Sequence, residues 1–284
     1  MRSMEGSKVS PERGATVVDL AVGGWPLDGV HVLRADAFLA ADRPDRLEVC
    51  LLSAGRDAPR PGERLVARRG GEVLFEGLIE RVAFELDRAR GRILSVVAYA
   101  DYHRLRPLWR PTVFYQTTDS EVAGAIAACL ELVAVVEPAE APRSRLVPDG
   151  DPLVFLRRRA RSCGFELAVT GGGLYFLREP PPAREPAVMR GLGDLIAVGV
   201  TDRGKRRGGR GGTVDLLGDP RWKPLSSVVL AGIDPVANGT YHVVRVLHRM
   251  DPSGYKTTLE ILEEGLDYPL WQHGAEGDEE KNAG

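Results

Sequence analysis

The side chains best suited to acid-base or nucleophilic chemistry are spread along this chain and form no local catalytic pattern. The histidines are His31, His103, His242, His248 and His273. No Cys–His pair and no Asp/Glu pair is fixed by local spacing. Carboxylates such as Glu166 and Asp194 could still converge in the folded chain, as the acid-base pair of a glycosidase does. The sequence leaves that alternative open.

The short motifs that accompany catalysis or metal binding are missing as well. The sequence contains no GxSxG, HExxH or CxxC string and no Walker loop for phosphate. Gly191 and Gly193 begin a dinucleotide-like glycine string, but Ile196 occupies the place of its third small residue, and no βαβ pattern surrounds it. We therefore predict that the protein is not an enzyme and carries neither a cofactor nor a metal site.

The clearest concentration of charge is the stretch RGKRRGGRGG from Arg203 to Gly212. It is typical of a flexible, solvated loop between two strands; the alternative is an electrostatic contact with an acidic partner or a nucleic acid. RNA-binding RGG tracts are usually longer and carry interleaved aromatic residues, which are missing here, so we do not expect nucleic acid as a partner. The candidate contact residues are Arg203, Lys205, Arg206, Arg207 and Arg210.

Composition places the chain among globular proteins, with 284 residues, 43% hydrophobic content, 27% charged content and a net charge of −2. Such a charge argues against a general polyanion binder. No apolar run reaches transmembrane length, and the N-terminal residues lack the apolar stretch of a secretory signal. The three cysteines show no close pairing, and Cys129 and Cys163 lie in helical patterns, where we expect small core residues.

The stretch from residue 118 to residue 164 predicts two helices with well-defined ends. Thr118 and Glu121 have the spacing of a capping box. Asp151 followed by Pro152 has the form of an N-cap with proline at the first helical position, where a missing amide costs nothing. Gly164 marks the expected end of the second helix.

The same stretch indicates which helix faces are buried and how the chain continues after the second helix. Val122, Ile126 and Leu130 fall on one face of the first helix, which predicts a core contact. The arginine-rich run at positions 157–161 is interpreted as a solvated face of the second helix. The three glycines at positions 171–173, between alternating segments, predict a tight hairpin.

Alternating apolar segments with turn-rich separators occupy the chain before and after this stretch. This spacing is typical of small antiparallel barrels or sandwiches. The predicted fold is α+β and mainly antiparallel β, with two related small β-barrels flanking a small α/β segment. The expected parts are a disordered N-terminus (1–14), a first barrel (15–106), an α/β insert with a Pro-rich linker (107–184), a second barrel (185–270) and a disordered acidic tail (271–284).

Two segments of the β-rich parts resemble each other. Ile79–Asp87 reads IERVAFELD and Val243–Asp251 reads VVRVLHRMD, with Arg-Val at the third and fourth positions of both. Each then turns through a glycine into another alternating strand. We interpret this as a structural duplication, the alternative being the chance likeness of any two β-hairpins. In this alignment His248 replaces a core phenylalanine and is expected to be a packed histidine.

Longer stretches of the chain resemble a known family. DYHRLRPLW, the Thr-Asp-Ser-Glu helix start and DPLVFLRRRARSCGFELAVTGGGLYF resemble the phage late control gene D family. It comprises the baseplate hub proteins of contractile tails and related injection systems, including the hub part of VgrG proteins. GTYHVVRVLHRMDPSGYKTTLEI resembles the closing hairpin of these hubs, and GERLVARRGGEVLFEGLIERV the strand pair of their first barrel. The likeness runs from Ala15 to Glu263; the basic, Gly-rich segment 199–214 departs from it.

The resemblance implies a structural role. Hubs of this family are homotrimers in which each chain contributes two similar barrels, so that a pseudo-hexameric ring adapts a hexameric inner tail tube to a trimeric spike. The implied partners are the chain itself, the spike, the tube and baseplate wedge or LysM-type proteins, with no membrane. The implied place is a tail or injection particle assembled in the bacterial cytoplasm. The alternatives are a tail-associated cell-wall hydrolase and a nucleic-acid-binding barrel protein.

Overall fold

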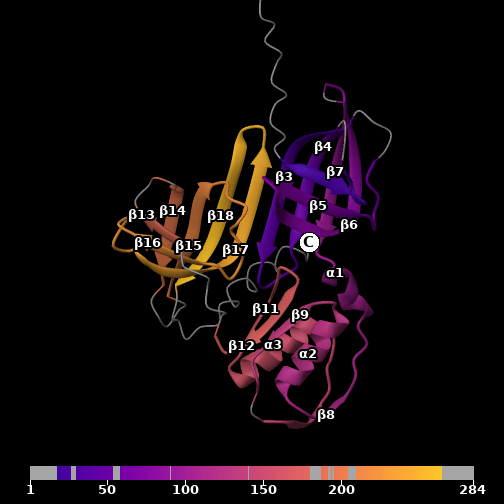
Figure 1. Ribbon diagram of the computed structural model, residues 1–284, viewed down its shortest axis with the longest axis vertical. Helices are drawn as coiled ribbons and strands as arrows, with labels where there is room; N and C mark the ends of the chain where they lie inside the picture. The colour runs from indigo at the N-terminus through magenta and orange to yellow at the C-terminus, as the bar shows by residue number, and fades with distance from the viewer. Residues whose placement is uncertain are drawn as a thin grey trace, which may run out of the picture.

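The computed structural model describes residues 18–26, 30–53, 58–89, 91–139, 141–179, 187–190, 193, 195–203 and 209–263. Figure 1 shows two groups of strands side by side, the first indigo to purple and the second orange to yellow, with a smaller α/β part below them. Most of the described regular structure is antiparallel β, with three short α-helices. None of the described helices is long and apolar enough to span a membrane. The expected disordered ends, 1–14 and 271–284, lie outside the described residues.

The first strand group curls around one core. Its strands are β1 (Asp19–Val22), β2 (Trp25–Pro26), β3 (Val30–Ala40), β4 (Arg46–Ser53), β5 (Arg64–Arg69), β6 (Glu72–Asp87) and β7 (Gly91–Tyr99). They are hydrogen-bonded in the order β3-β4-β7-β6-β5-β1-β2. Successive strand residues point to opposite faces, and Leu47, Val49 and Leu51 of β4 accordingly all enter the core.

The second strand group repeats this arrangement around a core of its own, which includes Val214, Tyr241 and Leu259. Its strands are β13 (Ala187–Arg190), β14 (Leu195–Asp202), β15 (Arg210–Leu217), β16 (Ser227–Ala231), β17 (Gly239–Asp251) and β18 (Gly254–Glu263). They follow the order β14-β15-β18-β17-β16, with β13 parallel to β16 at the end.

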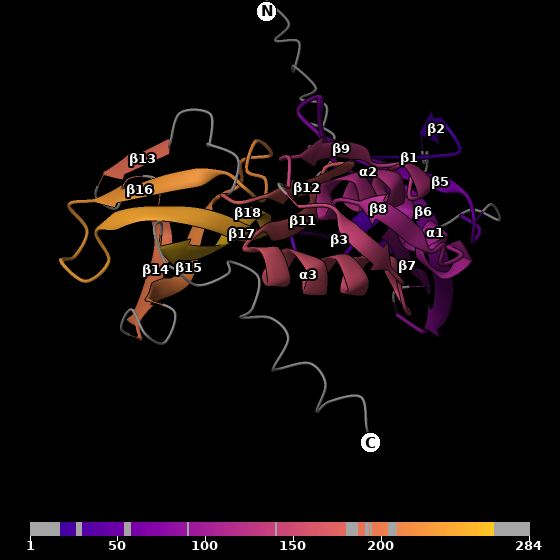
Figure 2. The same cartoon turned by 90° about the horizontal axis from the view of Figure 1, so that it is seen from below.

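The insert lies between the two groups in the sequence. It contains α1 (Tyr102–Leu105), η1 (Arg106–Leu108), β8 (Phe114–Thr117), α2 (Asp119–Cys129), β9 (Val133–Val136), β10 (Arg143–Leu146), α3 (Pro152–Cys163), β11 (Glu166–Thr170) and β12 (Gly173–Leu177). Seen from below, it lies in front of the first strand group, with the second group to one side (Figure 2). Strands β8, β9 and β10 were not expected from the sequence, because each is only four residues long.

The predicted helix ends are confirmed. Thr118 and Glu121 form the capping box of α2, and the Asp151 side chain accepts from the amides of Leu153 and Val154 at the start of α3. Gly164 ends α3 in the left-handed conformation, with φ of 71°. One core prediction was wrong: Cys129, the last residue of α2, is exposed.

The two separate barrels expected from the sequence are not found as closed structures. Strand β17 pairs with β3, and this joins both groups into one 13-stranded sheet. Along the described residues its strand order runs open from β14 to β2. The physical reason is that the edge of β3 is hydrogen-bonded to β17, so the same edge cannot pair with another strand of the first group to close a barrel.

Candidate assembly interface

The β6–β7 and β17–β18 hairpins share one register. A register shift lies at the same place in both, between Ile79 and Arg81 in β6 and between Val243 and Arg245 in β17. From there the pairing runs in step to the ends of the hairpins. The terminal pairs are Asp87 with Gly91 and Asp251 with Gly254. The predicted duplication is thus confirmed at the level of single residue pairs.

The equivalence extends beyond the hairpins. The amide of Gly62 donates to the Ile79 carbonyl at 2.8 Å, and the amide of Leu225 donates to the Val243 carbonyl at 2.8 Å. Both donor residues have a left-handed backbone, with φ of 89° and 71°. Such a conformation is rare for leucine, so a chance likeness of two hairpins does not account for it. We call β3–β7 the first unit and β14–β18 the second unit.

The two hairpins differ in what covers them. Val246, His248 and Met250 of β17 are buried, and Met250 enters the core of the first unit. At the positions equivalent to His248 and Met250, Phe84 and Leu86 of β6 are 69% and 74% exposed. The same pattern of residues is therefore covered in one unit and open in the other.

The inner seam, where β17 pairs with β3, explains the burial on one side. Residues 245–250 of β17 lie opposite residues 40–35 of β3. Arg245 donates to Asp42 at 2.7 Å, and Arg249 donates to Asp36 at 3.1 Å. Burial opposes the charge of Arg245, but the hydrogen bonds and charge of Asp42 outweigh it and raise the pKa of the guanidinium. The seam is thus closed by strand pairing, core packing and two ion pairs.

His248 is a packed core histidine, as expected. It is fully buried, and its Nε2 donates to the Trp222 carbonyl at 3.1 Å, while Nδ1 lies 2.9 Å from the Tyr255 hydroxyl. Because the carbonyl can only accept, the proton is on Nε2 and Nδ1 accepts from the hydroxyl. Burial, with the nearby charge of Lys223, lowers the pKa of His248 to about 4, so the ring is neutral at pH 7.

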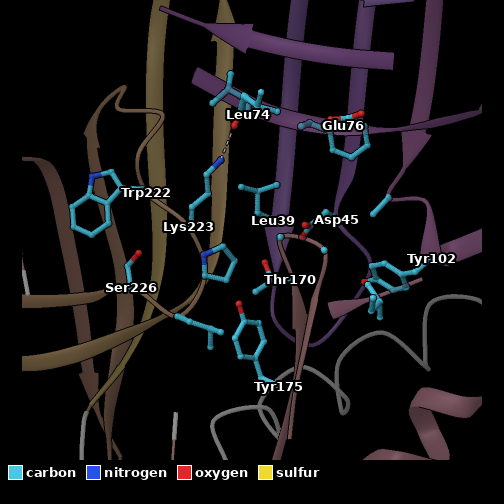
Figure 3. A pocket seen from close by; sticks show the side chains of 18 of the residues that line it. Leu39, Asp45, Leu74, Glu76, Tyr102, Thr170, Tyr175, Trp222, Lys223 and Ser226 are labelled. Atoms are coloured by element: carbon cyan, nitrogen blue, oxygen red, sulfur yellow. Dashed lines mark hydrogen bonds between the residues drawn. The ribbon is translucent and has the colours of Figure 1, made fainter. Parts of the chain in front are cut away.

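A cleft of about 1170 Å³ lies where the two units and the insert meet. Figure 3 shows Asp45, Tyr175 and Lys223 along it, from three different parts of the chain. Lys223 donates to the Val73 carbonyl at 2.9 Å, which ties the second unit to β6. Burial lowers the pKa of Lys223.

Asp45 is the most perturbed carboxylate in this cleft. Burial raises its pKa to about 6, although the backbone amides of Ala40 and Gly171 donate to it. Gly171 is the tip of the β11–β12 hairpin, so the carboxylate joins the insert to the end of β3. A raised pKa can mark a catalytic acid, but the bonds to both amides give Asp45 a positioning role here.

Two arginines of the run interpreted as solvated also have structural partners. Arg157 donates to the Asp42 carbonyl at 2.8 Å and so docks α3 on the first unit. Arg159 makes two hydrogen bonds, of 2.6 and 3.0 Å, to the buried carboxylate of Asp119. The interpretation was wrong for these two, because contacts between parts far apart in sequence decide their environment.

Of the basic contact residues, the structure describes Arg203, just after β14, and Arg210, the first residue of β15. Arg210 donates to Glu263 at 2.6 Å and to the Asn238 carbonyl at 2.7 Å, and its guanidinium lies 5.8 Å from the Tyr241 ring centroid. The amide of Arg203 donates to the Gly209 carbonyl. Lys205, Arg206 and Arg207 lie outside the described residues, and the contact role of the loop stays a prediction. Over the described ranges, no three His, Cys, Asp or Glu side chains group to hold a metal ion.

Comparisons with known proteins give the fold a context. No protein-family model matches the sequence, and no curated protein matches it. Among solved structures, it is similar to the 43 kDa tail protein of prophage MuSo2 from Shewanella oneidensis, with a TM-score of 0.69 and 14% identity over 87% of this chain and 97% of that one. A tail protein from Neisseria meningitidis MC58 has a TM-score of 0.69 and 15% identity over 88% and 97%.

A third similar structure comes from a secretion machine. The E. coli c3393 protein is a component of the type VI secretion system with structural similarity to the T4 bacteriophage tail proteins gp27 and gp5. Its TM-score is 0.69 at 11% identity, over 88% of this chain and 78% of that one. At these identities the likeness establishes a fold shared with these three proteins.

Proposed function

We propose that this chain is a structural baseplate hub of a contractile tail or injection system. In this role three copies form a pseudo-hexameric ring that adapts a hexameric inner tube to a trimeric spike. The observation that carries the proposal is the duplicated unit, with its matched register shift and matched left-handed residue. A chain with two equivalent units supplies six similar positions from three copies, which is what such an adaptor needs.

The fold of the similar tail and secretion proteins supports the same role. Proposed partners are the chain itself, the spike, the tube and wedge or LysM-type proteins, within a particle assembled in the bacterial cytoplasm. The cell-wall hydrolase is not favoured, because the cleft's perturbed carboxylate, Asp45, accepts from two structural amides.

Light scattering tests the proposal on the purified chain, alone and mixed with candidate spike and tube proteins. We expect a mass three times that of one chain, and a complex that retains this trimer when the spike is added. A stable monomer in every mixture contradicts the hub role. Peptidoglycan turnover that disappears on changing a single carboxylate would instead support the hydrolase.

A further inference from the structure

Two of the longer strand edges of the described sheet, on β6 and β14, have no partner strand. Beyond Ile79, β6 pairs only with β7, and β14 pairs only with β15. Unpaired edges of this length are templates for adding another strand, and proteins usually cover or blunt them. In the second unit the edge equivalent to that of β6 is covered, because residues 245–250 of β17 pair with β3.

The equivalence of the units identifies the missing partner of β6. Strand β3 is the first strand of the first unit, and β14 holds the same place in the second unit. From this we infer that β6 of one copy pairs, antiparallel, with β14 of a second copy of this chain. We call this contact the outer seam; the inference rests on the proposed ring and names the surfaces that would close it.

Residue pairing fixes the register of the outer seam. In the first unit, Val82 pairs with Val96, which pairs with Val49. In the second unit, Val246 pairs with Leu259, which pairs with Val214. Because Val82 and Val246 are equivalent, Val49 and Val214 are equivalent too. Ala35 faces Val49 and Val198 faces Val214. Val198 is therefore the equivalent of Ala35, which lies opposite Met250 in the inner seam. The outer seam accordingly places Leu86 opposite Val198 and Phe84 opposite Val200.

The side chains at these positions suit one another. Val198 and Val200 are partly buried and pack against the core of the second unit. Phe84 and Leu86 are exposed, and the outer seam would bring them to that core as Met250 is brought to the core of the first unit. Removing two large apolar side chains from water favours this contact through the hydrophobic effect. This explains why an otherwise polar hairpin end carries Phe84 and Leu86.

The charges of the two seams differ. In the inner seam, Arg245 lies opposite Ala40 and donates a hydrogen bond to Asp42. The same register places Arg81, the equivalent of Arg245, opposite Arg203 of the second copy. At this position the outer seam therefore has no counterpart of the Arg245–Asp42 ion pair, and strand pairing and apolar burial would hold the contact. Because it joins different surfaces of each copy, it is a heterologous contact, which generates a closed ring or an open chain of copies.

Cysteine cross-linking tests this contact directly. Opposed residues of antiparallel strands have Cα atoms about 4.5–5.5 Å apart, within disulfide range. We expect Leu86→Cys with Val198→Cys, in a Cys129→Ser background, to form reducible dimers and trimers on oxidation. A mixture of the two single variants should stop at dimers. The matched control, Leu86→Cys with Val236→Cys on another exposed loop residue, should show only the background of the Cys129→Ser chain.

A second pair of variants tests the apolar contribution. Phe84→Asp and Leu86→Asp change exposed side chains, so each chain should keep the circular dichroism and melting temperature of the wild type under conditions where that is monomeric. The protein concentration needed for assembly should rise at least tenfold for each variant, whereas Val236→Asp should leave it unchanged. If the wild type forms a trimer but the double-cysteine variant forms no 86–198 cross-link and both aspartate variants still assemble, the outer seam is overturned and the hub role remains. A chain that neither assembles nor cross-links contradicts both.

Discussion

Arg245 of β17 and Asp42, beyond the end of β3, are joined by hydrogen bonds of 2.7 and 3.2 Å across the line where the two units meet. Both side chains are largely buried, with 25% and 13% exposure. Arg245 also donates to Glu260 of β18 at 3.0 Å. The guanidinium therefore connects the second hairpin to the first unit.

Arg245→Met tests this connection. The variant keeps much of the apolar stem but removes the two hydrogen bonds from Arg245 to the Asp42 carboxylate, so the free energy of unfolding should fall by about 1–3 kcal/mol. Urea unfolding measures the change, and a double-mutant cycle with Asp42→Asn isolates the coupling. As control, Arg158→Met removes an exposed partner of Asp149 and should have a much smaller effect, because solvent screens an exposed ion pair. Equal effects of the two variants would show that the seam pair is not structural.

His248→Gln tests the buried neutral histidine. The pKa of His248 is about 4 in the folded protein, below its ordinary 6.5. Between these values the unfolded chain binds a proton that the folded chain does not, so stability is lost as pH falls from 6.5 to 4. From pH 7.5 to 4.5, wild type should lose about 2 kcal/mol more than the variant, by urea unfolding. Parallel pH profiles would contradict a neutral buried ring.

Asp45→Asn tests the carboxylate in the cleft between the two units and the insert. Its effect on stability changes with pH in the direction opposite to that of His248. The pKa of Asp45 is about 6 in the folded protein, above its ordinary 3.8. The folded chain binds the extra proton in this window, so Asp45 lowers stability as pH rises from 4 to 6. The variant's stability relative to wild type should therefore rise by about 2 kcal/mol from pH 4 to pH 7. A difference independent of pH would mean that Asp45 ionises normally.

The effects of His248 and Asp45 overlap in pH and oppose each other. Between pH 4 and pH 6.5 the profiles of the two single variants should therefore deviate from the wild-type profile in opposite directions. A double variant, His248→Gln with Asp45→Asn, should restore a flat contribution from these two sites. If it shows the slope of only one single variant, the two groups do not titrate independently.

Local features of this fold could be predicted from the sequence, whereas contacts between distant segments could not. Thr118, Asp151 and Gly164 are recognisable because a helix cap is decided within a few residues. The two hairpins can be matched because the alternation of apolar and polar side chains determines the strand register. The pairing of β17 with β3 has no such local signal, since it joins strands that lie far apart in the sequence.

The candidate site was harder to predict for the same reason. Asp45 looks like an ordinary loop carboxylate, and the sequence gives no sign that the distant hairpin tip at Gly171 donates a hydrogen bond to it. Phe84 and Leu86 have the pattern of core residues, and their exposure depends on which strand covers β6. The alignment of His248 with Phe84 contained the useful signal, because equivalent positions imply equivalent neighbours.

Electron microscopy of the purified chain, alone and with its spike, tests the central claim most directly. End-on class averages should show a closed ring with three-fold symmetry and six similar lobes, two from each copy. Isolated particles with two lobes at every concentration would contradict the account, as would open filaments or rings of another order.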